Sequence, residues 1–165
     1  MKEARILLID DEEKIHESFK LIFDREINAT DTPKGVKDPL FEGTQEDDLK
    51  FKITIDSCKS GDEGIKKFKE AIESKNHYHL VICDMRMPPG KDGKMTLEEI
   101  SVLAGSKLTA FVCTAFSDYD INEVKSSIKG EKHFLGWIEK PFTAEDVKDM
   151  ILIRLEMVTI GEPDL

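Results

Sequence analysis

The feature that most constrains the fold is a regular alternation of short apolar runs with amphipathic stretches. Five runs stand out, at Arg5–Ile9, Phe51–Ile55, Leu80–Cys83, Thr109–Cys113 and Leu135–Ile138, and most of them are continuous rather than alternating in polarity. Continuous runs rich in Ile, Val and Leu are typical of strands in a parallel sheet that is covered on both faces. Each run therefore predicts a buried strand.

Helical periodicity occupies the intervals between these runs. Helices are predicted at Glu12–Asp24, Gly61–Ser74, Thr96–Leu103, Ile121–Ile128 and about 144–159. Capping boxes, Ser60 with Glu63 and Thr143 with Asp146, mark the starts of two of them. Alternating strands and helices predict an α/β fold, with a doubly wound five-stranded parallel sheet. In such open sheets, ligands bind beyond the carboxyl ends of the strands.

One interval is too long for this pattern. Roughly 25 residues separate the first helix from the second strand, whereas such connections are usually ~2–6 residues long. Residues 30–50 carry prolines, glycines and several acids without a clear period. We predict a single domain over 1–165 with a surface insert at about 30–50. The insert is either tolerated without a function or binds a partner.

Charge and hydropathy exclude several classes of function. The formal net charge is −10, which disfavours binding to nucleic acid or to an anionic membrane surface. No apolar run approaches the ~20 residues that span a bilayer, and the N-terminus lacks the pattern of a secretory signal. A cytoplasmic protein is expected. Three isolated cysteines are predicted to be small buried hydrophobes, and the scattered histidines to lie at the surface or at strand edges.

Polar groups follow four of the five predicted strands. They are Asp10, Asp11, Asp84, Thr114, Ala115 and Lys140. Carboxylates placed together repel one another, by about 4 kcal/mol for two unit charges ~4 Å apart at a surface-like dielectric. A cation must offset this repulsion, and Mg²⁺ suits hard oxygen ligands. Metal, lysine, hydroxyl and a nucleophilic carboxylate are the groups that phosphoryl transfer needs.

The motifs at these positions resemble those of a known family. The strings LLIDDEE, VICDMRMPP, VCTAFSD and WIEKPF resemble the signature of response-regulator receiver domains of two-component signalling. The resemblance covers residues 4–155 apart from the insert. It implies the flavodoxin-like receiver fold with strand order 2-1-3-4-5. The longer loop after Asp84 and the string CTAFSDY are similar to a subgroup often joined to sensor histidine kinases.

The resemblance also implies a role for each residue of the site. Asp84 is the expected phosphoacceptor, and Mg²⁺ is expected at Asp10, Asp11, Asp84 and the backbone carbonyl of Arg86. The Thr114 hydroxyl and the Ala115 N–H are expected to bind the phosphoryl group, and Lys140 to pair with its oxygens. Pro141 is expected to follow a cis peptide bond. These eight residues all belong to predicted strand ends or to the loops that follow them.

Three positions around the expected site are unusual for the family that the motifs resemble. Trp137 stands where the family carries a switch Tyr or Phe, so it either takes part in switching with Thr114 or fills space in the core. Arg86 and Phe116 are large residues that the resemblance places at the mouth of the pocket. They predict slow hydrolysis of the phosphoryl-aspartate.

The expected function is a signalling switch rather than an enzyme, with only self-phosphorylation and slow self-dephosphorylation. A histidine kinase or a phosphotransfer protein would donate the phosphoryl group. The apolar last helix would contact core, an output domain, another partner or a second copy. The alternatives are a phosphohydrolase with an aspartyl-phosphate intermediate, and a receiver-like scaffold that is not phosphorylated. A hydrolase would need a general acid where Arg86 stands.

Overall fold

The computed structural model describes residues 2–23, 51–105, 107–115, 120–128 and 133–160. The predicted insert at 30–50 and Phe116 lie outside the described residues. Within them, strands and helices alternate along the chain as predicted. The elements are β1 (Lys2–Ile9), α1 (Glu13–Phe23), β2 (Phe51–Cys58), α3 (Gly61–Glu73), β3 (Leu80–Cys83), α4 (Gly93–Ala104), β4 (Thr109–Ala115), α5 (Ile121–Ser127), β5 (Phe134–Lys140) and α6 (Ala144–Ile160).

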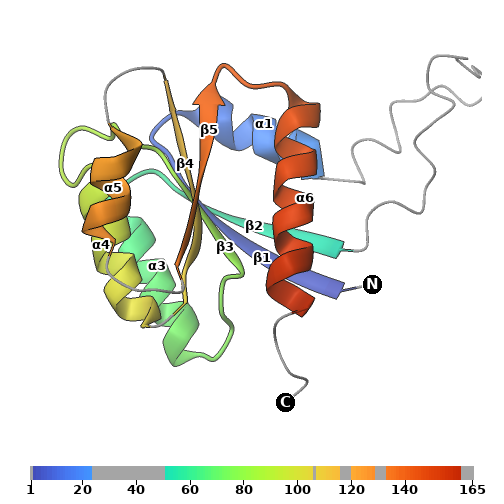
Figure 1. Ribbon diagram of the computed structural model, residues 1–165, viewed down its shortest axis with the longest axis horizontal. Coiled ribbons are helices and arrows are strands. Elements are labelled where there is room, and N and C mark those ends of the chain that lie inside the picture. The colour runs from blue at the N-terminus through green and yellow to red at the C-terminus, as the bar shows by residue number, and fades with distance from the viewer. Residues whose placement is uncertain (1, 24–50, 106, 116–119, 129–132, 161–165) are drawn as a thin grey trace, which may run out of the picture.

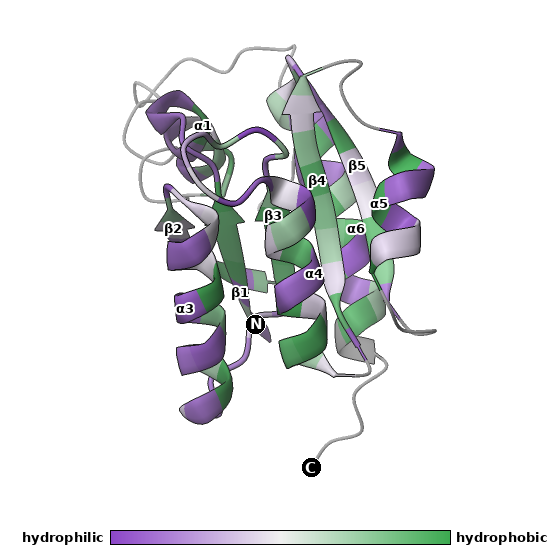
Figure 2. Ribbon diagram, turned by 90° about the vertical axis from the view of Figure 1, so that its left-hand side faces the viewer, coloured by the Kyte–Doolittle hydropathy of each residue, from purple (hydrophilic) through white to green (hydrophobic). Residues whose placement is uncertain are grey.

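The five strands form one parallel sheet in the order β2-β1-β3-β4-β5. This order confirms the predicted flavodoxin-like topology. Helices α1 and α6 cover one face, and α3, α4 and α5 cover the other (Figure 1). In Figure 2 the strands are largely hydrophobic, whereas the outward surface of α3 is hydrophilic. The carboxyl ends of all five strands consequently meet at one edge of the sheet.

The core has two halves because the sheet is covered on both faces. Alternate residues of β1 point to opposite sides: Leu7 and Ile9 join Phe68 and Leu97 beneath α3 and α4, while Ile6 and Leu8 join the other half with α1 and α6. This two-sided burial explains why the strands appear in the sequence as continuous apolar runs. Cys58, Cys83 and Cys113 are buried and unpaired, as predicted. No described helix could cross a membrane.

Several element boundaries differ from the prediction. Helix α4 begins at Gly93, not at Thr96, because the Asp92 side chain caps it by accepting a hydrogen bond from Met95 N at 2.8 Å. The first hydrogen bond of each predicted capping box is present: Ser60 Oγ accepts from Glu63 N at 3.2 Å, and Thr143 Oγ1 accepts from Asp146 N, also at 3.2 Å.

The histidine prediction is correct for two strand-edge residues and wrong for one. His79 Nδ1 accepts a hydrogen bond from Arg5 N at 3.0 Å, and His133 Nδ1 accepts one from Leu108 N at 2.8 Å. His16, by contrast, is buried on α1, and its Nε2 lies 2.7 Å from the carbonyl oxygen of Asp10. This contact ties α1 to the end of β1, immediately beside the candidate site.

Candidate functional site

Backbone pairing brings Asp10 and Asp84 side by side. Ile9 and Cys83 are partners in the β1–β3 register, so the residues that follow them leave the sheet together. Asp84 N donates to Ile9 O at 2.8 Å, and Asp10 N donates to Cys58 O at 3.0 Å. Both aspartates are buried, although each carries a carboxylate. The sheet itself therefore holds two acidic groups close together in a poorly solvated place.

Four carboxylates converge at this edge. One oxygen from each of Asp10, Asp11, Glu12 and Asp84 lies within 4.8 Å of the others. Asp11 and Glu12 are exposed, unlike the two buried aspartates. Sequence reasoning assigned no role to Glu12, although it is the third consecutive acid after β1. The acidic run itself was the signal that could have found it.

Lys140 provides the positive charge of the cluster. It ends β5, and its Nζ lies 2.8 Å from Asp10 Oδ2 and 3.5 Å from both Asp84 Oδ2 and Glu12 Oε1. Its side chain is only 12% exposed, so these interactions are weakly screened. The Lys140–Pro141 peptide bond is cis, which confirms that prediction. A second cis bond joins Pro88 to Pro89.

Burial and mutual repulsion make the two aspartates hard to ionise. Burial raises the pKa of Asp84 to about 6, and the charge of Asp10 adds to this shift, while Lys140 opposes it. Burial also raises the pKa of Asp10, and its hydrogen bond with Lys140 limits the shift. Burial alone would lower the pKa of Lys140, but its contacts with Asp10 and Asp84 raise it. The cluster therefore favours additional positive charge.

Thr114 and Ala115 lie at the end of β4, beside β5. In the β4–β5 register, Thr114 pairs with Glu139 and Ala115 pairs with Lys140. Thr114 is 5% exposed, and its hydroxyl makes only a long 3.4 Å contact with Ala115 O. Such a weakly engaged hydroxyl is available to a ligand oxygen. The structure thus brings Thr114, Ala115 and Lys140 to the same sheet edge as the acids.

The loop after Asp84 is fixed against the end of β3 by Gly93. Gly93 N donates to Met85 O at 3.0 Å. A Cβ at Gly93 would lie 2.1 Å from Asp84 O and 2.7 Å from Met85 Cα, closer than any side chain can approach. Within the loop, Arg86 N donates to Asp84 Oδ1 at 3.4 Å. The loop is thus held against the end of β3, next to Asp84.

Comparison with known proteins shows which solved structures have a similar fold. No family model and no curated protein matches the chain. Its fold is similar to that of a CheY-like response regulator receiver domain from Methanospirillum hungatei JF-1, with TM-score 0.64, 19% identity and coverage of 98% of this chain and 100% of that one. The chain has the fold of a receiver domain.

Two further solved structures have a similar fold, and both are receiver domains of response regulators. A response regulator receiver domain from Clostridium thermocellum gives TM-score 0.64 at 24% identity, covering 96% of this chain and 99% of that one. The response regulator domain of Thermotoga maritima CheB gives 0.58 at 19% identity, covering 98% and 100%. Identities this low establish the receiver fold, and the chemistry of the site is argued from its residues.

Trp137 occupies an intermediate position in this receiver fold. It is half-buried on β5, three residues before Lys140, and packs against the half of the core beneath α3, α4 and α5. It also lines a surface groove beside α6. An aromatic side chain that contacts both core and surface suits either predicted role, space-filling or switching.

The donor set of the site fits Mg²⁺. Carboxylate oxygens are hard ligands, and a small divalent ion bound by a few of them retains waters for exchange with phosphoryl oxygens. No histidine or cysteine belongs to the group of four acids. Asp10, Asp11 and Asp84 are the residues that could hold the ion, and Glu12 adds negative charge at the same place.

Proposed function

We propose that this chain is a phosphorylation switch in which Asp84 accepts a phosphoryl group from a sensor histidine kinase or a phosphotransfer protein. The supporting observation is the position of Lys140 Nζ, 2.8 Å from Asp10 Oδ2 and 3.5 Å from Asp84 Oδ2. One cation bridges two buried carboxylates at the point where further negative charge would be added. Preorganised positive charge of this kind is what phosphoryl transfer requires.

Hydrogen bonding favours Asp84 over Asp10 as the acceptor. Asp10 is engaged at both oxygens: Oδ1 accepts from Glu12 N at 2.9 Å and Oδ2 accepts from Lys140 Nζ at 2.8 Å. The contacts of Asp84 are longer, 3.4 Å from Arg86 N and 3.5 Å from Lys140 Nζ. A loosely held carboxylate can attack, whereas a tightly held one positions its neighbours.

In the proposed reaction, a carboxylate oxygen of Asp84 attacks the phosphorus of a donor phosphohistidine. The phosphorus–nitrogen bond breaks, the nitrogen keeps its electron pair, and an acyl phosphate forms on Asp84. Lys140 pairs with the phosphoryl oxygens, and the Thr114 hydroxyl and the Ala115 N–H donate to them. Asp10, Asp11, Asp84 and the Arg86 carbonyl would hold Mg²⁺, which would supply positive charge to neutralise the transferred group.

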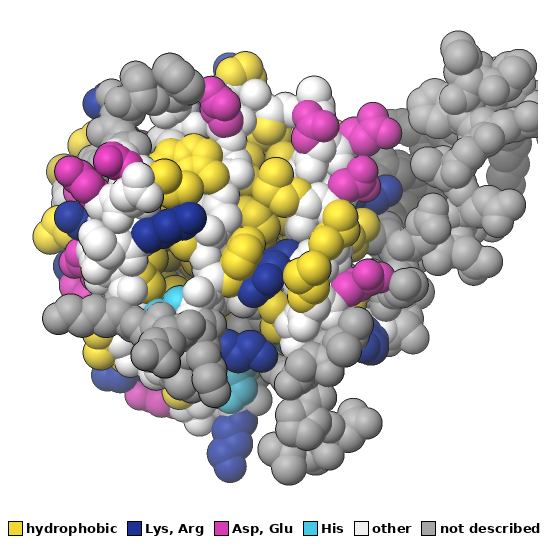
Figure 3. All heavy atoms as spheres, viewed as in Figure 1, with side chains coloured by type: hydrophobic (Ala, Val, Ile, Leu, Met, Phe, Trp, Pro, Cys, Tyr) yellow, Lys and Arg dark blue, Asp and Glu magenta, His cyan; other side chains and the backbone are white. Residues whose placement is uncertain are grey.

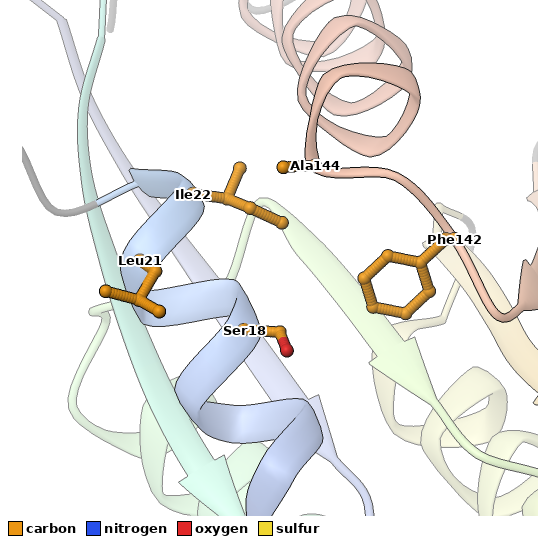
Figure 4. A pocket seen from close by; sticks show the side chains of 5 residues that line it. All are labelled: Ser18, Leu21, Ile22, Phe142 and Ala144. Carbon is orange, nitrogen blue, oxygen red and sulfur yellow. The ribbon is translucent and has the colours of Figure 1, made fainter.

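An apolar pocket lies between α1 and the start of α6, close to this edge. It has a volume of about 240 Å³ and is lined by Ser18, Leu21, Ile22, Phe142 and Ala144. The side chains of Leu21 and Ile22 come from α1, and Ile22 points toward Phe142 of the loop after β5 (Figure 4). Leu21 is 53% exposed. A donor protein must cover this end to reach Asp84, and this pocket would receive its apolar side chains.

The experiment is phosphorylation by acetyl phosphate with Mg²⁺, followed by intact-mass measurement. Wild type should gain one phosphoryl group, and Asp84→Asn should gain none. Asp149→Asn is the matched control, because Asp149 is an acid on α6 outside the group of four. It should be labelled as wild type is. Omission of Mg²⁺ should abolish labelling in both labelled proteins.

Two other outcomes would replace this proposal. An unlabelled wild type that still binds Mg²⁺ would indicate a scaffold with the receiver fold but without the switch. Continuous turnover of a small phosphate ester would indicate a phosphohydrolase. Arg86 disfavours the second outcome, because a guanidinium does not serve as a general acid near neutral pH.

A further inference from the structure

A groove opens at the surface between strand β5 and helix α6. It has a volume of about 370 Å³, at the lower end of the ~300–1,000 Å³ that small-molecule sites occupy. Apolar residues make up most of its lining, and Arg154 is the one charged residue among the described residues that line it. Figure 3 shows hydrophobic side chains gathered in the region of β5 and α6, with a basic side chain in their midst. An apolar cleft with one charged group has the composition of a site for a small amphiphilic molecule.

Aromatic rings form the β5 side of the groove. A Cβ at Gly136 would lie 2.3 Å from the Phe111 ring, so the glycine lets this ring pack directly on the backbone of β5. The Phe134 ring meets the Phe111 ring edge to face, with 5.7 Å between the two centroids. Trp137 lies on the same strand and also lines the groove. Flat or branched apolar groups pack well against such rings.

Helix α6 provides apolar side chains on the other side of the groove. Three of them are largely in contact with solvent: Met150 is 37% exposed, Ile153 57% and Met157 59%. A ligand in the groove would remove part of this apolar surface from water, and that burial is favourable. The aromatic side and the α6 side together could therefore hold the apolar body of a ligand.

The charge of Arg154 has no counterpart within the described residues. Its guanidinium carbon lies 3.6 Å from the centroid of the Phe134 ring, and its Nη1 lies 3.7 Å from Met157 Sδ, which is only a weak acceptor. Its Nε is buried without a hydrogen-bond partner. Burial lowers the pKa of Arg154, and no carboxylate opposes this shift. The groove thus presents a poorly solvated cation that lacks an anion.

We infer that this groove binds a small organic monocarboxylate with an aromatic or branched aliphatic body. The carboxylate would pair with the guanidinium of Arg154, whose planar donors match its two oxygens. The apolar body would lie against the rings of Phe134 and Trp137. The inference uses no residue of the acidic site, so it does not rest on the proposed function.

The surroundings of Arg154 favour a monocarboxylate over a phosphate. One guanidinium can offset one negative charge, and the second charge of a phosphate would remain unpaired next to apolar groups, which is costly. The chain also carries a formal net charge of −10, which repels a dianion more strongly than a monoanion. An uncharged apolar molecule would leave Arg154 without a partner in the groove.

Titration of the whole 165-residue chain with hydrocinnamate at pH 7.5, without added Mg²⁺, tests the inference. Hydrocinnamate carries a carboxylate on a short phenyl-bearing chain, and hydrocinnamide is its uncharged counterpart. Isothermal titration calorimetry should give a Kd on the order of 1 mM for the acid, as expected for so small a ligand, and a Kd about tenfold or more higher for the amide. The emission of Trp137, the only tryptophan, should change with the same Kd.

Substitution of Arg154 tests where the carboxylate binds. Arg154→Met keeps a long apolar side chain without the charge and should raise the Kd for hydrocinnamate about tenfold, whereas Arg154→Lys should raise it less. Lys69→Met is the matched control, because it removes one positive charge from an exposed position of α3, and it should leave the Kd unchanged. Asp84→Asn should also bind normally. Circular dichroism melting should confirm that all four variants fold.

Four results would overturn the inference. The first is the absence of heat and of an emission change up to about 10 mM hydrocinnamate. The second is equal affinity for hydrocinnamate and hydrocinnamide, and the third is unchanged affinity in Arg154→Met. The fourth is a dimer in sedimentation equilibrium that hydrocinnamate does not dissociate and that Arg154→Met weakens, which would assign the groove to a second copy of the chain.

Discussion

At the scale of single residues, the acidic cluster makes Asp84 a destabilising group in the metal-free protein. Its pKa of about 6 lies above the ordinary value of 3.8, so the folded state binds its proton more tightly than the unfolded chain does. This contribution to stability is complete below pH 4 and is lost as the pH rises through 6. Above that pH, the ionised Asp84 costs on the order of 2 kcal/mol.

Asp84→Asn should therefore stabilise the metal-free protein at pH 8, because the amide removes both the buried charge and its repulsion with Asp10. The gain on the order of 2 kcal/mol corresponds to a rise in Tm of roughly 5 °C. The measurement is thermal unfolding in EDTA from pH 4 to pH 8. The gain should shrink to nothing near pH 4, and a lower Tm for the variant at pH 8 would contradict the assignment.

Substitution of Lys140 should destabilise the protein, in contrast to Asp84→Asn. Lys140→Met leaves Asp10 and Asp84 buried without their cation, and removal of one partner from a buried ion pair costs about 3–5 kcal/mol. We expect a loss of that order in urea unfolding at pH 7.5 in EDTA. Lys69→Met, a change at an exposed lysine of α3, is the control and should shift the free energy of unfolding by less than about 0.5 kcal/mol.

Arg86 bears on how long the modification lasts. Its side chain is exposed at the start of the loop after Asp84, where a large group would hinder the approach of water to the proposed acyl phosphate. Arg86→Ala should shorten the half-life of the phosphorylated protein several-fold, measured by mass spectrometry after removal of acetyl phosphate. An equal or longer half-life would show that Arg86 does not shield the acyl phosphate.

At the scale of elements, the sequence predicted strands better than helix starts. The run Leu80–Cys83 is buried on both sides, so its apolar character reports its position directly. Helix α4 starts three residues before its predicted start, because Gly93 and Lys94 carry no apolar period and the capping residue Asp92 lies outside the periodic stretch. The burial of His16 had no sequence signal at all, because its partner is a backbone carbonyl of Asp10.

Gly93 shows how one element depends on another. Alanine is a better helix former than glycine by about 1 kcal/mol, so Gly93→Ala would stabilise an isolated α4. In the folded chain, the Cβ of the alanine would instead lie 2.1 Å from the backbone oxygen of Asp84. The loop after Asp84 would therefore have to move. We expect a net destabilisation of about 2 kcal/mol or more, with weaker Mg²⁺ binding.

The control for that prediction is Lys94→Ala, which changes the next position of α4 without a backbone contact of this kind. It should unfold at the same urea concentration as wild type. Equal stability of the Gly93→Ala variant and wild type would show that the loop after Asp84 adjusts freely. In that case, Gly93 would not be the residue that holds the loop after Asp84 against β3.

At the scale of the whole molecule, the acidic edge and the groove beside α6 share strand β5. Lys140 ends β5 at the acids, Trp137 lies three residues earlier at the groove, and Phe134 begins the strand beneath Arg154. The β4–β5 register also pairs Val112 with Trp137 two positions before Thr114 pairs with Glu139. A displacement of Lys140 or Thr114 toward a phosphoryl group would thus be carried along two neighbouring strands.

Trp137 is the only tryptophan of the chain, so its fluorescence reports this coupling directly. Acetyl phosphate with Mg²⁺ should change the intensity or wavelength of its emission, because a half-buried indole is sensitive to a small change in solvent contact. Asp84→Asn should give no change beyond that of Mg²⁺ alone. Thr114→Ala should still gain the phosphoryl group but show a much smaller emission change, because the acceptor is intact and the hydroxyl contact is lost. Full labelling of wild type without any change in emission would show that phosphorylation at the site is not coupled to the groove. Trp137 would then be a core residue that takes no part in switching.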